Sequence, residues 1–198
     1  MISPEFVYLA ALIDIIGCTT YAWATIKGHT KPNRVTWVLW TLSSGIVFLG
    51  QVSEGVGLPA VLTFAAAFGP FLVVVASFLN KNAYWKLSAF DVVCGSISLL
   101  ALALWGITQT GLIAIYLSLL SDLMASLPTV VKSYQAPQTE SPTTYLLGLV
   151  AGVITLLTIQ NWTLETYIFP VYVVILCVVI YTLIKFPKLR PRRVEARP

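Results

Sequence analysis

The chain has 198 residues, of which 58% are hydrophobic and only 10% are charged, with a net charge of +4 and a mean hydropathy of +0.85. Soluble domains carry roughly 25% charged residues, so this composition excludes an ordinary water-facing surface and favours an integral membrane protein. The three cysteines, Cys18, Cys94 and Cys177, all lie in apolar segments. An odd, widely spaced set predicts neither disulfides nor a metal site.

Seven segments are long and apolar enough to cross a bilayer as helices, which takes about 20 residues each. The hydrocarbon core tolerates only helices or closed barrels, and these segments are continuous rather than alternating, so we predict an all-α membrane protein. The predicted spans are Phe6–Ile26, Arg34–Val52, Leu58–Leu79, Lys86–Trp105, Leu112–Val131, Thr143–Ile159 and Leu164–Ile184.

The basic residues indicate the orientation, because Lys and Arg stay on the cytoplasmic side of a membrane. With seven spans, all 12 Lys and Arg fall on one side, whereas Glu5, Glu54 and Glu165 lie on the other. We therefore expect an outside N-terminus and a basic cytoplasmic tail over residues 186–198, in contact with lipid headgroups rather than nucleic acid. Short loops favour a multi-pass protein of a bacterial inner (plasma) membrane.

An internal repeat is indicated when the chain is shifted by 108 positions on itself, as many transporters are built from repeats. The shift aligns Asp14 with Asp122. It also aligns further pairs, namely Gly17 with Ala125, Cys18 with Ser126, Thr36 with Thr144, Trp37 with Tyr145 and Ile46 with Ile154. The prediction is a first three-helix repeat (1–79), a linker helix (80–108) and a second repeat (109–185). Because the linker is a single span, the two repeats would be parallel bundles in a 3-1-3 order.

The chain resembles the SWEET/PQ-loop superfamily of small seven-helix transporters, most clearly in its second half. That family has a helix with a Pro-Gln pair, then a basic residue and a short polar loop, and here Pro128 and Lys132 precede the loop segment Pro137–Ser141. Thr129 replaces the glutamine, and the first half has Thr20-Tyr21 at the equivalent place. The resemblance implies a divergent transporter, without implying an inherited substrate.

Asp14 and Asp122 are the leading site candidates. A carboxylate near the bilayer centre is costly, so it faces the bundle interior, pairs with a partner or stays protonated. No Lys or Arg is expected at matching depth. The two residues therefore suit a proton relay or a cation site, and the alternative is packing by hydrogen bonds between helices.

An aromatic and polar stripe on the second predicted helix is a further candidate. Asn33 and Trp37 are four residues apart and share one face, with Tyr21 and Tyr145 as additional contributors to a site for a polar solute. The alternative is an interfacial belt. Pro70, Pro128 and Pro170 interrupt helix hydrogen bonding and are candidate hinges or kinks.

The favoured function is a small secondary transporter that moves a small polar solute, with protons or cations as coupling partners. The alternative is a non-transporting scaffold or sensor whose aspartates only hold helices together. Motifs of hydrolytic or metal-dependent enzymes are absent from the sequence, so we expect no enzyme, no cofactor and no metal. Homo-oligomerisation stays open.

Overall fold

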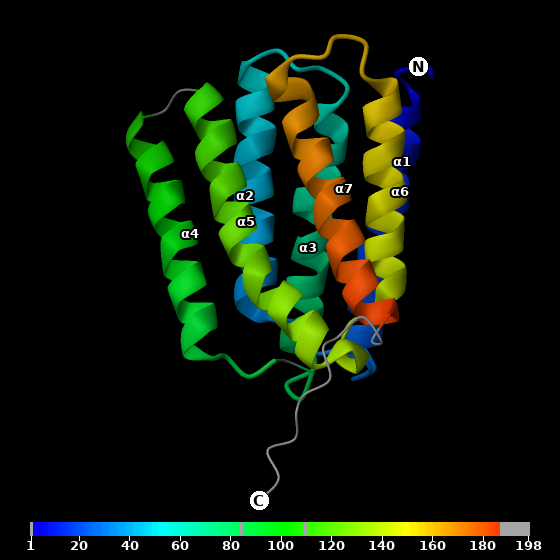
Figure 1. The fold of residues 1–198 in the computed structure, drawn as a ribbon, viewed down its shortest axis with the longest axis vertical. Coiled ribbons are helices and arrows are strands. Elements are labelled where there is room, and N and C mark those ends of the chain that lie inside the picture. The colour runs from blue at the N-terminus through cyan, green and yellow to red at the C-terminus, as the bar shows by residue number, and fades with distance from the viewer. Residues whose placement is uncertain (1, 84, 109–110, 187–198) are drawn as a thin grey trace, which may run out of the picture.

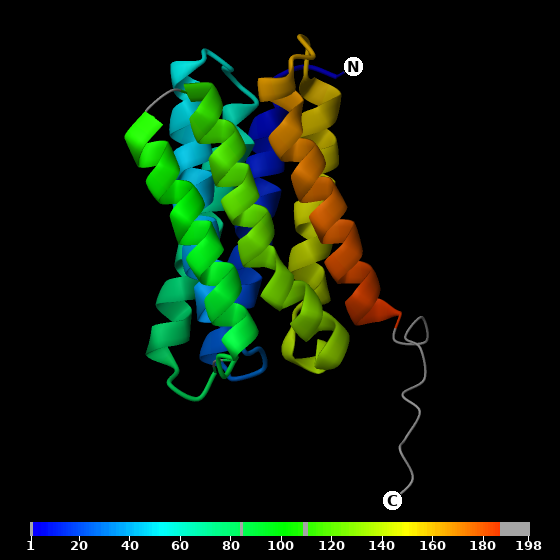
Figure 2. The same ribbon diagram turned by 60° about the vertical axis from the view of Figure 1, so that its left-hand side comes forward.

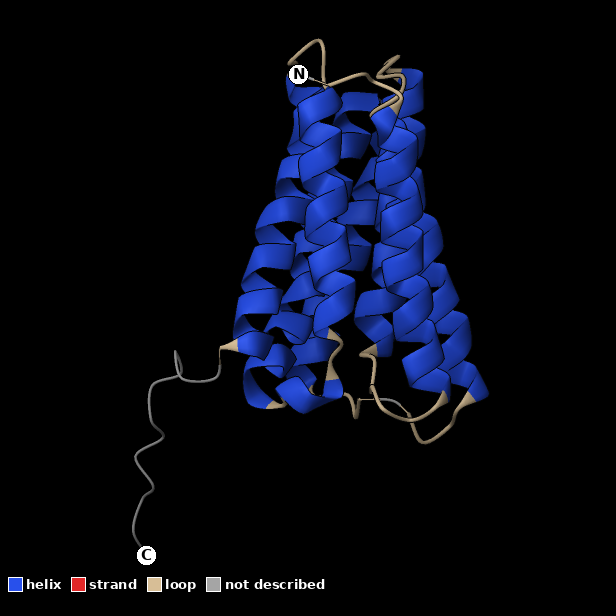
Figure 3. Cartoon of the chain, turned by 90° about the vertical axis from the view of Figure 1, so that its right-hand side faces the viewer, coloured by secondary structure: helices blue, strands red, loops and turns tan. Residues whose placement is uncertain are grey.

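A computed structural model describes residues 2–83, 85–108 and 111–186, and over these ranges the chain is all-helical (Figure 3). Each predicted segment coincides with one helix, and the largest end difference is at α5, which continues to Gln135. The helices are α1 (Phe6–Ile26), α2 (Arg34–Ser53), α3 (Ala60–Leu79), α4 (Ala89–Thr108), α5 (Gly111–Gln135), α6 (Pro142–Thr158) and α7 (Leu164–Lys185), with a short 3-10 turn η1 (Pro137–Thr139).

Local sequence signals account for several helix ends. The Asn33 side chain caps α2 by accepting hydrogen bonds from the backbone N–H groups of Val35 and Thr36, as expected of an N-cap asparagine. Thr163 and Thr166 form a capping box at the start of α7. Past the end of α1, Gly28 has a φ of 79°, a conformation that glycine adopts without steric cost.

The helices stand side by side in one bundle, with connections at alternate ends (Figure 1). Within the first triplet, α3 packs against both α1 and α2, and within the last triplet α7 packs against both α5 and α6. Between the triplets, α1 packs on α6 and α2 packs on α5. Helix α4 lies at the side of the bundle, against α5 and α2 (Figure 2).

Two threonine hydrogen bonds join the triplets. Thr36 Oγ1 on α2 donates to the carbonyl of Ala125 on α5 at 2.8 Å, and Thr144 Oγ1 on α6 donates to the carbonyl of Gly17 on α1 at 2.9 Å. Both threonines are buried. Side-chain donors of this kind hold neighbouring helices together where no water competes for the carbonyl.

The outer faces of the bundle carry many exposed large apolar side chains, among them Phe78, Leu100, Val150 and Ile175. Five helices (α1, α2, α3, α5 and α7) are long and apolar enough to cross a membrane, and α6 is a shorter apolar helix of 17 residues. Apolar surface of this extent is typical of contact with lipid or partner proteins rather than water. The fold is compatible with a multi-pass membrane protein.

The described basic residues gather at one end of the bundle. The connections α1–α2, α3–α4 and α5–α6 lie at one end, together with the last residues of α7 (Figure 1). The described basic residues of this end are Lys27, Lys31, Arg34, Lys81, Lys86, Lys132 and Lys185. The remaining basic residues belong to the predicted tail, which lies outside the described residues except for Phe186.

Helices α1 and α3 approach closely at Gly69. A Cβ atom at this position would lie 2.6 Å from Sγ and 2.8 Å from Cβ of Cys18. Distances this short do not occur between real side chains, so the absence of a side chain at Gly69 sets the separation of the two helices.

Replacing Gly69 with alanine is expected to lower the midpoint of thermal unfolding in detergent, because overpacking costs about 1–3 kcal/mol. The matched control is Gly45→Ala in α2, where a new Cβ would meet nothing within 4 Å. Circular dichroism of the two purified variants gives the comparison. Equal midpoints would contradict the tight contact between α1 and α3.

Candidate functional site

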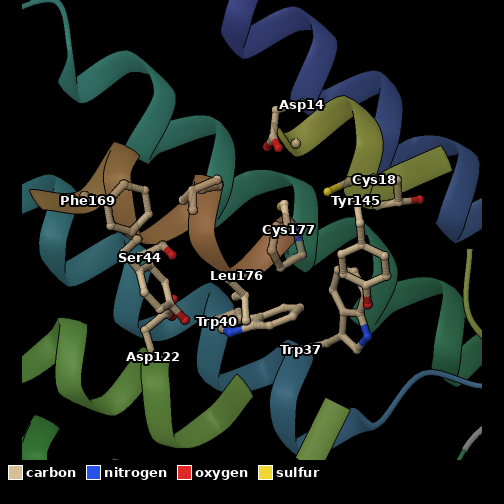
Figure 4. A pocket seen from close by; sticks show the side chains of 16 residues that line it. Asp14, Cys18, Trp37, Trp40, Ser44, Asp122, Tyr145, Phe169, Leu176 and Cys177 are labelled. Carbon is tan, nitrogen blue, oxygen red and sulfur yellow. The ribbon is translucent and has the colours of Figure 1, made fainter. Parts of the chain in front are cut away.

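A cavity of about 80 Å³ lies between the two triplets, with room for roughly five water molecules. Its walls come from α1, α2, α3, α5, α6 and α7, and α4 contributes none of the described lining residues. The lining residues are Asp14, Cys18, Trp37, Trp40, Ser44, Ala66, Pro70, Asp122, Thr144, Tyr145, Gly148, Phe169, Tyr172, Val173, Leu176 and Cys177 (Figure 4).

Asp14 projects from the middle of α1 and is 9% exposed. Its Oδ2 atom is buried and makes no hydrogen bond to any residue that the structure describes. A buried polar atom without a partner is costly, and in native proteins it commonly marks a site for a ligand, ion or water. Among the described residues of the cavity wall, Asp14 is the acidic one with such an atom, and the other unpartnered atoms are Trp37 Nε1, Trp40 Nε1 and the Tyr172 hydroxyl.

Asp122, on α5, is 3% exposed and lies on the other side of the cavity, near Ser44 and Phe169 (Figure 4). Its Oδ1 atom accepts a hydrogen bond from the hydroxyl of Ser43 on α2. The bond links the two triplets close to the middle of both helices. The two aspartates thus share one cavity but differ in their surroundings.

Aromatic rings form part of the remaining wall. Trp37 and Trp40 lie on α2 with ring centroids 5.1 Å apart, and Tyr21 packs behind Trp37 at 4.7 Å. Tyr145 on α6 and Phe169 on α7 complete this surface. Such faces bind apolar groups and attract cations.

A buried ion pair lies at the basic end of the bundle, adjacent to the cavity. Lys132 Nζ is 2.5 Å from Glu140 Oε1, and Glu140 Oε2 accepts a hydrogen bond of 2.9 Å from the Tyr145 hydroxyl. Lys132 also donates to the carbonyl of Lys31, and the Lys31 amide donates to the carbonyl of Thr139 at 3.0 Å. These contacts tie the α1–α2 connection to α5 and to the α5–α6 connection.

The predicted site residues are only partly brought together. Asp14, Asp122, Trp37, Tyr145 and Pro70 line the cavity, whereas the remaining four candidates do not. Tyr21 lies behind Trp37, and Asn33 caps α2 and donates to Asp91 Oδ1 at 2.7 Å. Pro128 lines a separate surface pocket beside Lys132, and Pro170 is buried in α7 next to Phe169.

Sequence reasoning missed the partnership of Lys132 and Glu140. It treated Lys132 as a topology signal and as the basic residue of the family resemblance, although Glu140 is an acidic residue on the basic side and had no assigned role. An acidic residue in a connection where positive charge prevails is the signal that indicates a pair. Sequence reasoning also omitted Phe169 and Tyr172, because their inward direction depends on how α7 packs.

Replacing Glu140 with glutamine is expected to destabilise the protein by about 3–5 kcal/mol, because it leaves the buried Lys132 ammonium unpaired. The double variant Lys132→Met with Glu140→Gln should be more stable than Glu140→Gln alone, since both charges are then gone. Unfolding of the single and double variants in detergent gives the coupling energy. Lys81→Met, at an exposed position of the same end, is the control, and purely additive effects would contradict the pair.

Comparisons of the chain with protein-family models, with curated proteins and with solved structures give no match. The residues that line the cavity and the ion pair beside it are therefore the basis for assigning a function.

Proposed function

We propose that the protein is a small secondary transporter that spans the membrane and moves a small polar solute between two parallel three-helix bundles. The observation that carries this proposal is the cavity, because all six helices of the two triplets contribute to its wall and both Asp14 and Asp122 lie on it. Transporter sites of this kind lie near the bilayer midplane at the interface of structural repeats.

The 3-1-3 repeat is supported by the two threonine hydrogen bonds between the triplets. An offset of 108 positions converts the donor Thr36 into Thr144 and relates the acceptors Gly17 and Ala125. The same exchange of triplets converts the α1–α6 contact into the α5–α2 contact. A two-fold axis along the membrane normal would relate these two helix pairs and would place the same bond at equivalent positions in both. A divergent branch of the SWEET/PQ-loop superfamily is the family assignment that we propose.

The proposed orientation places the basic end in the cytoplasm of a bacterial inner membrane and the N-terminus outside. The apolar outer faces of the helices supply the lipid-facing surface, and the segregation of basic residues follows the rule for cytoplasmic connections. On this assignment the Lys132–Glu140 pair closes the cavity on its cytoplasmic side.

Transport then requires this closure to open and the opposite end to close around the solute. Separation of the α1–α2 and α5–α6 connections breaks the contacts of Lys132 with Glu140 and with Lys31. Pro70 lies on the cavity wall within α3, where a missing backbone hydrogen bond gives the helix a place to bend. Pro128 and Pro170 are the equivalent proposals for α5 and α7.

Coupling to protons or another cation is proposed to run through Asp14 and Asp122. Asp14 is the better ion ligand, because Oδ2 is buried without a partner. Binding of a proton or cation removes the cost of that unpaired oxygen. Asp122 keeps its bond to Ser43 and would respond when α2 and α5 move apart.

The second candidate is a non-transporting scaffold or sensor, and the Ser43–Asp122 bond is the observation that favours it. A hydrogen bond between helices at mid-depth is enough to explain a buried aspartate as packing glue. This alternative predicts that water has no route to the cavity, so the accessibility of the cavity to water separates the two functions.

Proteoliposomes are expected to take up at least one solute from a panel of glycerol, glucose, alanine and butylammonium, and a pH gradient should change the rate. Asp14→Asn and Asp122→Asn should each lower the flux at least about tenfold, the loss that follows from removing a charge-assisted interaction. Glu54→Gln removes an exposed carboxylate from the opposite end and is the matched control. Parental rates and pH profiles in both aspartate variants would refute the coupling.

Thiol labelling tests for a water-accessible route with the native cysteines. Cys18 and Cys177 line the cavity, whereas Cys94 is buried in α4 away from it. Three variants that each keep one cysteine are treated with a membrane-impermeant methanethiosulfonate and measured by mass spectrometry. Cys18 and Cys177 should react faster than Cys94, and equal protection of all three thiols in the folded protein would favour the scaffold.

A further inference from the structure

We infer that the solute of the cavity is a small aliphatic amine in its ammonium form, with its charge paired to Asp14 and its hydrocarbon part against the aromatic wall. This inference rests on the proposed transport function and adds the substrate class to it.

The charges of the cavity favour a cation. Asp14 and Asp122 are the charged groups among the described lining residues, and none of these residues is Lys, Arg or His. An anion would enter with no opposite charge to pair with and would face two carboxyl groups, which is costly at a buried site. An ammonium group supplies the opposite charge and donates hydrogen bonds without accepting any.

Asp14 lies against the backbones of two neighbouring helices at glycine positions. A Cβ atom at Gly69 on α3 would lie 3.7 Å from Asp14 Oδ2, and one at Gly148 on α6 would lie 3.6 Å from Oδ1. The Oδ2 atom is enclosed at this contact without a hydrogen-bond partner among the described residues. An ammonium group in the cavity would supply the missing donor once the carboxylate turns toward it.

The positions that correspond to these glycines in the proposed repeat are aromatic. The offset of 108 that pairs Asp14 with Asp122 pairs Gly148 with Trp40, and alignment of Pro70 with Pro170 pairs Gly69 with Phe169. Both aromatic residues line the cavity. The cavity thus has one side where Asp14 lies among small residues and another where Asp122 lies near aromatic residues. Asp14 and the aromatic faces together complement a cationic head and a short alkyl chain.

The volume limits the size of the solute. Space for roughly five water molecules favours a short alkylamine over a larger solute. A small amine also complements both the carboxyl group of Asp14 and the aromatic part of the wall.

Binding of butylammonium, 1-butanol and butyrate to the purified protein in detergent tests the inference, because these probes share one hydrocarbon chain and differ in charge. Equilibrium dialysis should show butylammonium bound at least about tenfold more tightly than the other two, the loss expected when a charge-assisted hydrogen bond is absent. Binding of 1-butanol or butyrate as tightly as butylammonium would overturn the inference, and so would tighter binding of glucose.

Asp14→Asn should lower the affinity for butylammonium by the same factor, because it removes the carboxylate. Asp14→Glu should retain part of that affinity, and the control Glu54→Gln should leave the affinity unchanged. Trp40→Phe should bind more tightly than Trp40→Leu, because phenylalanine keeps an aromatic face. Unchanged affinity in Asp14→Asn overturns the assignment. If that variant does not fold, the charge series on the unmodified protein decides alone.

Flux measurements separate this inference from the transport proposal. Butylammonium that binds without crossing the proteoliposome membrane would refute transport and leave the ligand class standing. Uptake of another panel solute by a protein that does not bind butylammonium would refute the ligand class and leave transport standing.

Discussion

Two carboxyl groups buried in the middle of an apolar bundle impose the constraint on which the rest of the structure depends. Water cannot solvate them there, so each must find a hydrogen-bond donor, a proton or a cation. Asp122 obtains a donor from Ser43 on the facing helix, whereas Asp14 Oδ2 has none among the described residues. One carboxyl group is therefore bound by a neighbouring side chain and the other has an oxygen without a described partner, within a cavity that both line.

Two threonine hydrogen bonds of the same kind join the triplets. Thr36 and Thr144 each donate to a backbone carbonyl of the other triplet. Under the proposed repeat these two bonds are equivalent, and the glycines beside Asp14 correspond to aromatic residues of the cavity wall. The proposed repeat would therefore combine similar helix packing with unequal side chains around the cavity.

The buried ion pair of Lys132 and Glu140 distinguishes the basic end of the bundle from the opposite end. A buried pair is a weak source of net stability, but its geometry is specific because either charge alone is costly. Here it connects segments from both halves and reaches the cavity through Tyr145. Under the proposed transport function, opening that end would need a concerted movement of the two connections rather than displacement of one side chain.

The sequence by itself determined the seven helices, their ends to within a few residues and the two-sided distribution of charge. Long apolar segments must satisfy their backbone polar groups internally, so hydropathy dictates helices. It also singled out Asp14, Asp122, Trp37 and Tyr145, which share one cavity. Only the tertiary structure decided that Asn33 caps a helix, that Glu140 pairs with Lys132, and that Phe169 and Tyr172 face inward. The physical reason is that apolar residues surround every helix of this chain, so the direction of a side chain is set by which neighbouring helix it meets.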